Sequence, residues 1–187
     1  MRIIAGEYRG RIIKMPKDGR VRPTQDRVRE AIFNVISKAV PGSKVLDLYA
    51  GSGAFGIEAI SRGAELAVFS DTNIKCIDIV KSNIALLGIE DSSVNILKKD
   101  AIKTIESLDG KGNKFDLVFL DPPYIDGSIA KNTLIKIGAC DILSGRSFVI
   151  AEHSAKHEMP YHTGSIRLLK KSKYGDTAVS FYYRSNP

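Results

Sequence analysis

Cysteine is scarce in this chain and long apolar runs are missing, and each shortage excludes a class of protein. The two cysteines, Cys76 and Cys140, are too few and too far apart for a disulfide framework or a zinc knuckle. No apolar run approaches the roughly 20 residues that span a bilayer, and no apolar signal segment follows the basic first residues. We therefore expect a cytoplasmic protein with reduced thiols and no membrane partner.

Positive charge is concentrated at the two ends of the chain. The 187 residues are 43% hydrophobic, which predicts a folded protein, and their formal net charge is +7. Residues 1–29 hold nine basic and three acidic side chains, a net charge of +6, and residues 151–187 have a net charge of +3. The middle, residues 30–150, has a net charge of −2. Basic surface beside a nearly neutral body is typical of a protein that meets phosphates, so we expect a nucleic-acid partner.

The middle of the chain alternates between strand-like and helix-like segments. Strands are expected at residues 44–48, 66–70, 94–97, 115–120 and 147–152, and helices at residues 55–62, 74–87, 102–108 and 129–137. This order predicts an α/β fold with a Rossmann-like, mostly parallel sheet that is covered on both faces. Residues 165–169 and 177–183 flank a polar turn with no helix between them, which predicts a C-terminal antiparallel hairpin.

The first 40 residues predict a small extension of that sheet. Residues 2–14 suit two short strands paired as a β-hairpin around Gly6 and Gly10. A helix is expected from about residue 25 to residue 39, with Thr24 as its N-cap. We therefore divide the chain into a basic hairpin and helix that dock on RNA, residues 1–40, and a larger domain, residues 41–187.

A glycine-rich turn lies between a strand and a helix at residues 51–56, GSGAFG. The turn matches G-x-G-x-x-G, and Asp71 lies 20 residues after Gly51, as in folds that bind NAD. Asp47 ends the preceding strand, where its carboxylate would repel a pyrophosphate by on the order of 4 kcal/mol. A cationic ligand reverses that sign. S-adenosylmethionine fits, since it carries an ammonium and a sulfonium, a ribose diol for Asp71 and an adenine amine for Asp100.

A second motif, Asp121-Pro122-Pro123-Tyr124, follows the apolar strand FDLVFL. The two prolines stiffen the loop and leave carbonyl groups and the Asp121 carboxylate as acceptors. Tyr124 offers a flat face on which a base can stack. Such groups suit an exocyclic amine, because hydrogen bonds from both of its N–H groups favour a pyramidal nitrogen that can attack a sulfonium methyl in line. Catalysis would then come mainly from positioning and desolvation.

Together these motifs resemble those of the class I amino-methyltransferases that use S-adenosylmethionine. The resemblance is carried by VLDLYAGSGAFGIEA, Asp71, Asp100-Ala101 and DPPY. The segments RIIAGEYRGR, RPTQDRVREAIFN and YGDTAVSFY are similar to one branch, the bacterial RsmD family of 16S rRNA guanine-N2 methyltransferases. The resemblance covers nearly the whole chain and implies one guanine of small-subunit rRNA as the substrate, in an assembled or partly assembled particle. Tyr49 stands where Phe is common, and Asp71 where Glu is frequent.

The motifs and the resemblance give a set of expected site residues. The residues expected to hold S-adenosylmethionine are Asp47, Tyr49, Gly51, Ser52, Gly53, Asp71, Asp100 and Ala101. Those expected to act on the base are Asp121, Pro122 and Tyr124. Contacts to RNA are expected from Arg9, Arg11, Arg22, Thr24 and Arg27. No metal is expected, because His153, His157 and His162 lie around Pro160 after a strand and are interpreted as surface residues.

Three other functions stay open at this point. DNA adenine-N6 and cytosine-N4 methyltransferases share the DPPY motif, although this chain is short for a separate target-recognition domain. A non-catalytic RNA-binding protein could use the same scaffold, but it would be expected to lose Asp121 or the glycines, and this chain retains both. Methylation of a protein or a small molecule would leave the basic N-terminal segment without a role.

Overall fold

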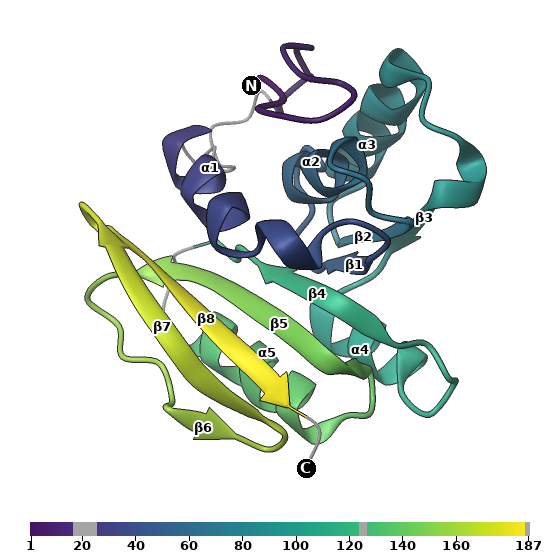
Figure 1. The fold of residues 1–187 in the computed structure, drawn as a ribbon. Coiled ribbons are helices and arrows are strands. Elements are labelled where there is room, and N and C mark those ends of the chain that lie inside the picture. Colours follow the sequence, from purple (N-terminus) through teal and green to yellow (C-terminus); the bar gives the residue numbers. More distant parts are fainter. Residues whose placement is uncertain (17–25, 124–126, 186–187) are drawn as a thin grey trace.

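The computed structural model describes residues 1–16, 26–123 and 127–185, and within them the strands form one eight-stranded sheet (Figure 1). The strand order is β3-β2-β1-β4-β5-β8-β7-β6. The strands are β1 (Lys44–Asp47), β2 (Leu66–Asp71), β3 (Val94–Lys98), β4 (Phe115–Leu120), β5 (Leu143–Ser154), β6 (His162–Thr163), β7 (Ile166–Tyr174) and β8 (Thr177–Ser185).

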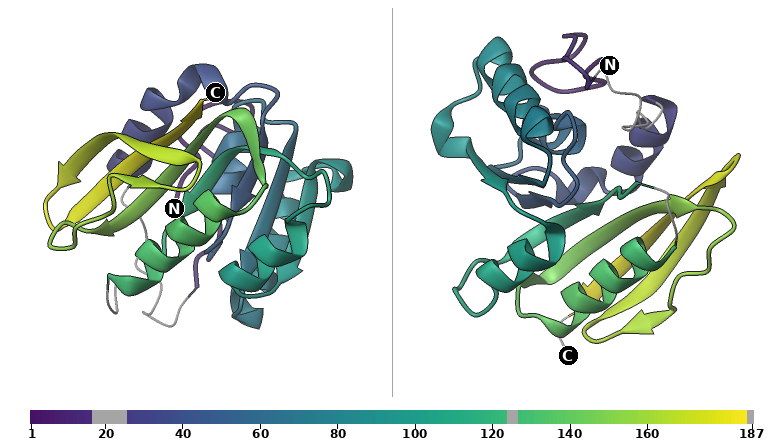
Figure 2. Two further views of the ribbon diagram at one scale, coloured as in Figure 1. Left: turned by 90° about the horizontal axis from the view of Figure 1, so that it is seen from below. Right: turned by 180° about the vertical axis from the view of Figure 1, so that it is seen from behind.

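Helices cover both faces of this sheet. They are α1 (Asp26–Val35), α2 (Ala54–Ser61), α3 (Ile74–Leu87), α4 (Ala101–Leu108) and α5 (Ser128–Ala139), with short 3-10 turns η1 (Ser37–Ala39) and η2 (Asp91–Ser93). Helices α1, α2 and α3 lie on one face, and α4 and α5 lie on the other (Figures 1 and 2). We call these the α1 face and the α5 face.

The pairing of the strands confirms the predicted architecture. Strands β1 to β5 pair in parallel, whereas β5 with β8, β8 with β7 and β7 with β6 pair antiparallel. Buried apolar residues form one cluster on each face of the sheet. Among the residues that the structure describes, no helix combines the length and the apolar character needed to cross a membrane.

Several strands differ from the sequence prediction at their ends, and β7 runs to Tyr174 where the prediction ended at residue 169. β5 begins at Leu143 rather than at Ser147 and ends at Ser154 rather than at Glu152, because Leu143 pairs with Phe115 of β4 and the antiparallel pairing with β8 runs along Arg146–Ser154. The two-residue strand β6 was not predicted, and it pairs with the first residues of β7.

The predicted N-terminal hairpin is reduced to one antiparallel bridge between Arg2 and Ile12. The Ile3 N–H still donates across the segment to the Arg11 carbonyl, whereas Ile4 and Ala5 donate instead to the Glu58 carboxylate on α2 at 2.8 and 3.1 Å. This segment also shares the core on the α1 face, where Ile3 and Ile13 are buried. The proposed division of the chain at residue 40 stays a prediction.

Candidate active site

The candidate site is formed where the parallel strands β2, β1 and β4 end side by side. Asp47 is the last residue of β1, and its register partners are Phe69 on β2 and Phe119 on β4. Asp71 is the last residue of β2, and Asp121 follows the end of β4. Parallel strands bring their carboxyl ends to one edge, which is where doubly wound folds bind ligands.

Glycine is required by the geometry of the turn that follows β1. Gly51 and Gly53 have φ angles of +55° and +80°, a region that residues with a Cβ rarely adopt. A Cβ on Gly56 would lie 2.3 Å from the ring of Phe69, so α2 can approach β2 only with glycine there. The turn is fixed to both neighbouring strands, since Leu48 donates to the Phe119 carbonyl and Ala50 to the Ser70 carbonyl. The motif therefore builds a rigid cradle at the strand ends.

Asp71 holds this turn in place. One carboxylate oxygen accepts the Gly51 N–H at 2.9 Å, and the other accepts the Asn73 N–H at 2.8 Å. The side chain is partly buried, so one face stays open to a ligand. The predicted cofactor residue thus has a structural duty in addition to any contact with a ribose.

Asp47 is a buried carboxyl beside the turn, with 1% of its surface exposed. It accepts the Gly56 N–H at 3.2 Å. Burial raises the pKa of Asp47 to about 7, the Gly56 hydrogen bond lowers it, and the charge of Asp71 raises it further. A positive group placed here would lower that pKa again, so this position favours a cationic ligand over a pyrophosphate.

The other predicted cofactor residues surround this edge. The Tyr49 hydroxyl lies 2.7 Å from Thr133 Oγ1 on α5, and burial raises the pKa of Tyr49. Asp100 is the N-cap of α4 and accepts the Lys103 N–H at 2.8 Å, while Ala101 is buried as the first residue of that helix. Ser52 is buried within the turn.

The structure describes part of the second motif. Asp121 is partly buried and Pro122 is buried, directly after β4 and next to the strand that ends at Asp47. Tyr124 lies outside the described residues, so its predicted stacking role stays a prediction.

Asn83 on α3 connects the glycine turn to the N-terminal segment, and sequence reasoning missed it. Its side-chain amide donates to the Ser52 carbonyl at 2.9 Å and to the Lys14 carbonyl at 3.1 Å. Its carbonyl oxygen accepts the Lys14 N–H at 2.8 Å. The signal was present in the sequence, because Asn83 occupies a position of the buried stripe of α3, where a polar residue needs partners.

Among the described basic side chains of residues 1–29, that of Arg29 is not on the surface. Arg29 is fully buried, with its guanidinium 3.7 Å from the Glu58 carboxylate, and it donates to the Arg2 carbonyl. Glu58 is also fully buried and accepts from Arg62 at 2.7 Å, and the Arg62 guanidinium lies 4.8 Å from the Phe33 ring centre. The formal net charge of residues 1–29 therefore overstates the positive charge that this segment presents on the surface, because Arg29 is buried against Glu58.

The described residues among those expected to contact RNA lie on the segment and helix at the α1 face. Arg9 and Arg27 are exposed. Arg11 is exposed as well, but its guanidinium donates to the Leu86 carbonyl at the end of α3 at 2.9 Å. Arg22 and Thr24 lie outside the described residues.

The sequence predicts surface positions for all three histidines, and for His153 that prediction is wrong. His153 is buried, and its ring nitrogens lie 2.9 Å from Ser180 Oγ and from the Ser154 carbonyl. Burial lowers its pKa. Within the described part of the chain, no three His, Cys, Asp or Glu side chains gather in a way that could hold a metal ion.

The similarity of this chain to known proteins extends over nearly its whole length. A model for the family described as conserved hypothetical protein 95 matches residues 1–183. YlbH of Bacillus subtilis, named as a candidate rRNA methyltransferase, is 37% identical over 182 residues, which are 97% of this chain and 98% of that protein. Ribosomal RNA small subunit methyltransferase D of Escherichia coli K12 is 29% identical over 184 residues, covering 98% and 90%.

Solved structures that are named as methyltransferases have the same fold as this chain. The candidate methyltransferase yhhF of Escherichia coli superposes with a TM-score of 0.84 at 28% identity, over 100% of this chain and 99% of that one. The methyltransferase candidate SMU.776, solved in complex with SAH, superposes with a TM-score of 0.70 over 87% of this chain and 50% of that one, at 14% identity. The sheet and helices therefore form the class I methyltransferase fold.

Proposed function

The chain belongs to the conserved hypothetical protein 95 family, and from that membership and the geometry of its site we propose that it is an S-adenosylmethionine-dependent methyltransferase acting on ribosomal RNA. The observation that carries the proposal is the adjacency of two motifs. The glycine cradle with Asp47 and the loop that begins at Asp121 lie at the ends of neighbouring parallel strands.

The residues present suit S-adenosylmethionine. Asp47 offers a buried carboxylate to a positive group, and the positive φ angles of Gly51 and Gly53 turn the backbone tightly around that carboxylate. Asp71 fixes the cradle and would accept hydrogen bonds from the ribose hydroxyls. Asp100 caps α4, and Tyr49 lies in the turn after β1 with its hydroxyl beside Thr133 of α5. Bound there, S-adenosylmethionine would supply an electrophilic methyl group on a sulfonium.

Residues of this chain would position the amine that receives the methyl group. We assign Asp121 and a neighbouring backbone carbonyl to the two N–H groups, with Pro122 keeping the loop rigid. Two acceptors aimed at one nitrogen favour its pyramidal form, and removal of water strengthens both hydrogen bonds. Tyr124 would stack on the base.

The finer substrate in this proposal is the N2 amine of one guanine of 16S rRNA within a small-subunit particle, with the protein acting in the cytoplasm. Two relatives named for rRNA methylation support RNA over DNA. The exposed Arg9 and Arg27 support a partner with a phosphate backbone.

The test is methyl transfer from labelled S-adenosylmethionine to small-subunit particles that lack the modification, followed by nucleotide mapping. We expect one methylated guanine with the parent protein. Asp121→Ala should abolish transfer while the affinity for S-adenosylhomocysteine stays within a few fold. Tyr124→Ala should weaken binding of the base by about 1–3 kcal/mol, and Tyr124→Phe should retain most of the activity.

Asp91→Ala is a suitable control, because Asp91 is exposed on η2. Methylation of DNA but not of rRNA would contradict the proposed substrate. Full activity of Asp121→Ala would contradict the proposed role of that residue. Tyr124→Phe as inactive as Tyr124→Ala would show that the hydroxyl matters and that stacking does not.

A further inference from the structure

A cleft of about 560 Å³ lies away from the candidate active site, near the amino ends of β1 and β4. Its lining includes Pro41, Arg146, Phe148, Leu169 and Tyr183. Leu169 is 60% exposed, which is unusual for a large apolar side chain on a strand. Neither the glycine cradle nor the loop after β4 uses this cleft.

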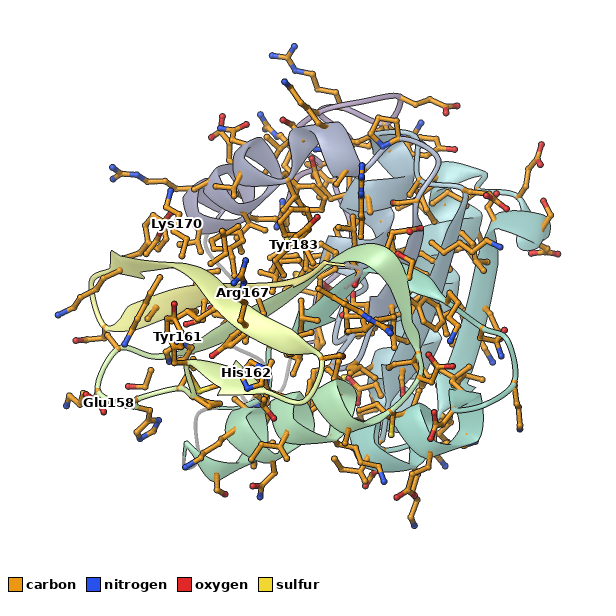
Figure 3. The ribbon with its side chains drawn as sticks, turned by 60° about the horizontal axis from the view of Figure 1, so that its bottom comes forward. Glu158, Tyr161, His162, Arg167, Lys170 and Tyr183 are labelled. Atoms are coloured by element: carbon orange, nitrogen blue, oxygen red, sulfur yellow. The ribbon has the colours of Figure 1, made fainter. Side chains whose placement is uncertain are left out.

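Strand register places aromatic rings and cations on the same face beside it. Tyr183 is directly opposite Phe148 on one side and Arg167 on the other, and directly opposite residues share a face of the sheet. The rings of Phe148 and Tyr183 are 5.1 Å apart between centroids. Lys170 is opposite Phe181, which belongs to the core on the α1 face. Figure 3 shows Arg167, Lys170 and Tyr183 toward α1, whereas Glu158, Tyr161 and His162 lie on the other side of the hairpin.

The charge around the cleft is almost entirely positive. Strand β7 carries four exposed cations and no acid, and its register places Arg167 and Lys170 on the α1 face beside the cleft, whereas Lys171 and Lys173 lie on the α5 face, opposite Ser180 and Ala178. Arg146 is exposed as well. The acidic residue of the lining, Asp116, accepts the Lys44 N–H at 2.8 Å. Lysines on an edge strand also prevent strand pairing between molecules, but that function would not call for an exposed leucine or an aromatic floor.

We propose that this cleft and the adjoining face of β7 form a second RNA-docking surface, which binds an unpaired segment of the rRNA next to the target guanine. One base would stack on Tyr183 beside Leu169, and phosphates would contact Arg146, Arg167 and Lys170. Stacking on aromatic side chains between cations is the common way in which proteins hold single-stranded RNA. The inference rests on the proposed function and deepens it.

The distance between the two sites suits one continuous piece of RNA. Asp116 and Asp121 lie at opposite ends of β4, and a strand rises by about 3.3 Å per residue, so the two levels are about 17 Å apart. At about 3.4 Å per nucleotide along a stacked strand, that distance corresponds to about five nucleotides. A base docked in the cleft would therefore restrain where the target guanine can lie.

The test compares two double variants with the same change of charge. Arg167→Glu with Lys170→Glu reverses the charge beside the cleft, and Lys111→Glu with Lys131→Glu reverses it on the α5 face, in the loop after α4 and on α5. For the cleft variant we expect the KM for small-subunit particles to rise at least tenfold, with kcat and the affinity for S-adenosylhomocysteine unchanged. The slope of log affinity against log salt should become less steep by about two. The control variant should match the parent in every measurement.

A second pair of variants tests stacking separately from charge. Tyr183→Ser should weaken RNA binding about tenfold without changing the salt slope, and Tyr183→Phe should bind like the parent. Ultraviolet crosslinking of bound 16S rRNA should label the peptide that contains Tyr183. Equal unfolding midpoints of all variants will show that the changes act on binding and not on folding.

Other outcomes separate this inference from the proposed function. If the parent methylates rRNA and the cleft variant matches it in KM and salt slope, the second surface is wrong while the proposed function stands. If the variant fails on particles but binds protein-free 16S rRNA like the parent, the cleft contacts a ribosomal protein and the RNA inference is wrong. A parent dimer that the variant dissociates would assign the cleft to a second copy of the chain instead. A parent that neither binds nor methylates rRNA would overturn both.

Discussion

The carboxyl edge of the sheet and the C-terminal hairpin both carry charge, but they hold it in opposite ways. At the carboxyl edge, Asp47 and Asp71 accept hydrogen bonds from the backbone of the turn that they border. On the hairpin, Arg167 and Lys170 project from an exposed strand. Fixed, partly desolvated groups suit a small ligand of defined geometry, whereas exposed cations suit a phosphate backbone whose exact position varies. A substitution at the edge should therefore change geometry and affinity together, and one on the hairpin should change mainly salt dependence.

The largest effect is expected from removing a buried charge, the Glu58 carboxylate on α2, the helix that follows the glycine turn. Glu58→Gln would leave the buried Arg29 with only the half-exposed Asp26 as a counter-charge and would weaken the acceptor of the Ile4 and Ala5 N–H groups. We expect the free energy of unfolding to fall by about 3–5 kcal/mol, measured by urea denaturation. Glu65→Gln, at an exposed position, should change it by less than about 0.5 kcal/mol. A loss below about 1 kcal/mol for Glu58→Gln would show that the buried pair does not hold the N-terminal segment.

The next effect concerns the cradle itself. Asp71→Ala would leave the Gly51 and Asn73 N–H groups without their acceptor. The affinity for S-adenosylhomocysteine should fall by about 1–3 kcal/mol, or roughly 5- to 150-fold, in a calorimetric titration. Asp78→Ala, at an exposed position of α3, is the matched control. Affinity within twofold of the parent would mean that the turn keeps its shape without Asp71.

A smaller effect should appear in the pH dependence of ligand binding. The pKa of Asp47 is raised to about 7, so the free protein holds this proton below that pH, whereas a cationic ligand favours the ionised form. Affinity for S-adenosylhomocysteine, which carries an ammonium, should therefore rise by up to about tenfold per pH unit toward pH 7 and level off above it. Calorimetry between pH 5.5 and 8.5 measures this, and Asp47→Asn should give a flat profile.

The raised pKa of Asp47 also predicts a pH dependence of protein stability, and its sign is opposite to that of ligand affinity. Between the ordinary pKa of 3.8 and about 7, the folded protein binds a proton that the unfolded chain has lost. The contribution of Asp47 to stability should therefore decline as the pH rises from about 4 to about 7, and then stay constant. Parent and Asp47→Asn unfolding curves that keep the same separation across this range would contradict the raised pKa.

The smallest expected effect is a difference between two arginines of the basic N-terminal segment in the salt dependence of RNA binding. Arg9 is exposed, whereas the Arg11 guanidinium donates to a carbonyl at the end of α3. Arg9→Ala should reduce the salt slope of RNA binding by about one, and Arg11→Ala should reduce it by less. Nucleotide mapping should find the same guanine in both variants, because phosphate contacts position a protein without reading sequence. A larger slope change for Arg11→Ala than for Arg9→Ala would reverse this assignment.

The local sequence pattern was enough to predict those helices and turns whose ends are determined by residues within or next to them. Helix α3 runs from Ile74 to Leu87 as predicted, because an apolar stripe ends at Gly88, whose φ of +70° closes the helix. The glycine turn and Asp47 were found for the same reason, since the turn needs glycine and the strand needs apolar neighbours. Pattern failed where the partner is distant in sequence. Arg29 resembles any surface arginine until α2 brings Glu58 against it, and the cleft exists only once β8 pairs with β5 and β7.

The attachment of the N-terminal segment also has a consequence for how the chain folds during synthesis. Its hydrogen bonds to Glu58, Ser61 and Asn83 join residues that are 53 to 69 positions apart. Gly6 packs so closely on α2 that a Cβ there would lie 1.7 Å from the Ser61 carbonyl oxygen, so this docking leaves no room for an approximate fit. At about 5–20 residues per second, the first residues wait roughly 3–14 seconds for those partners to be made, and longer for them to leave the ribosome. During that interval the most basic part of the chain lacks the partners that shape it, and it becomes a defined surface only after α2 and α3 have formed.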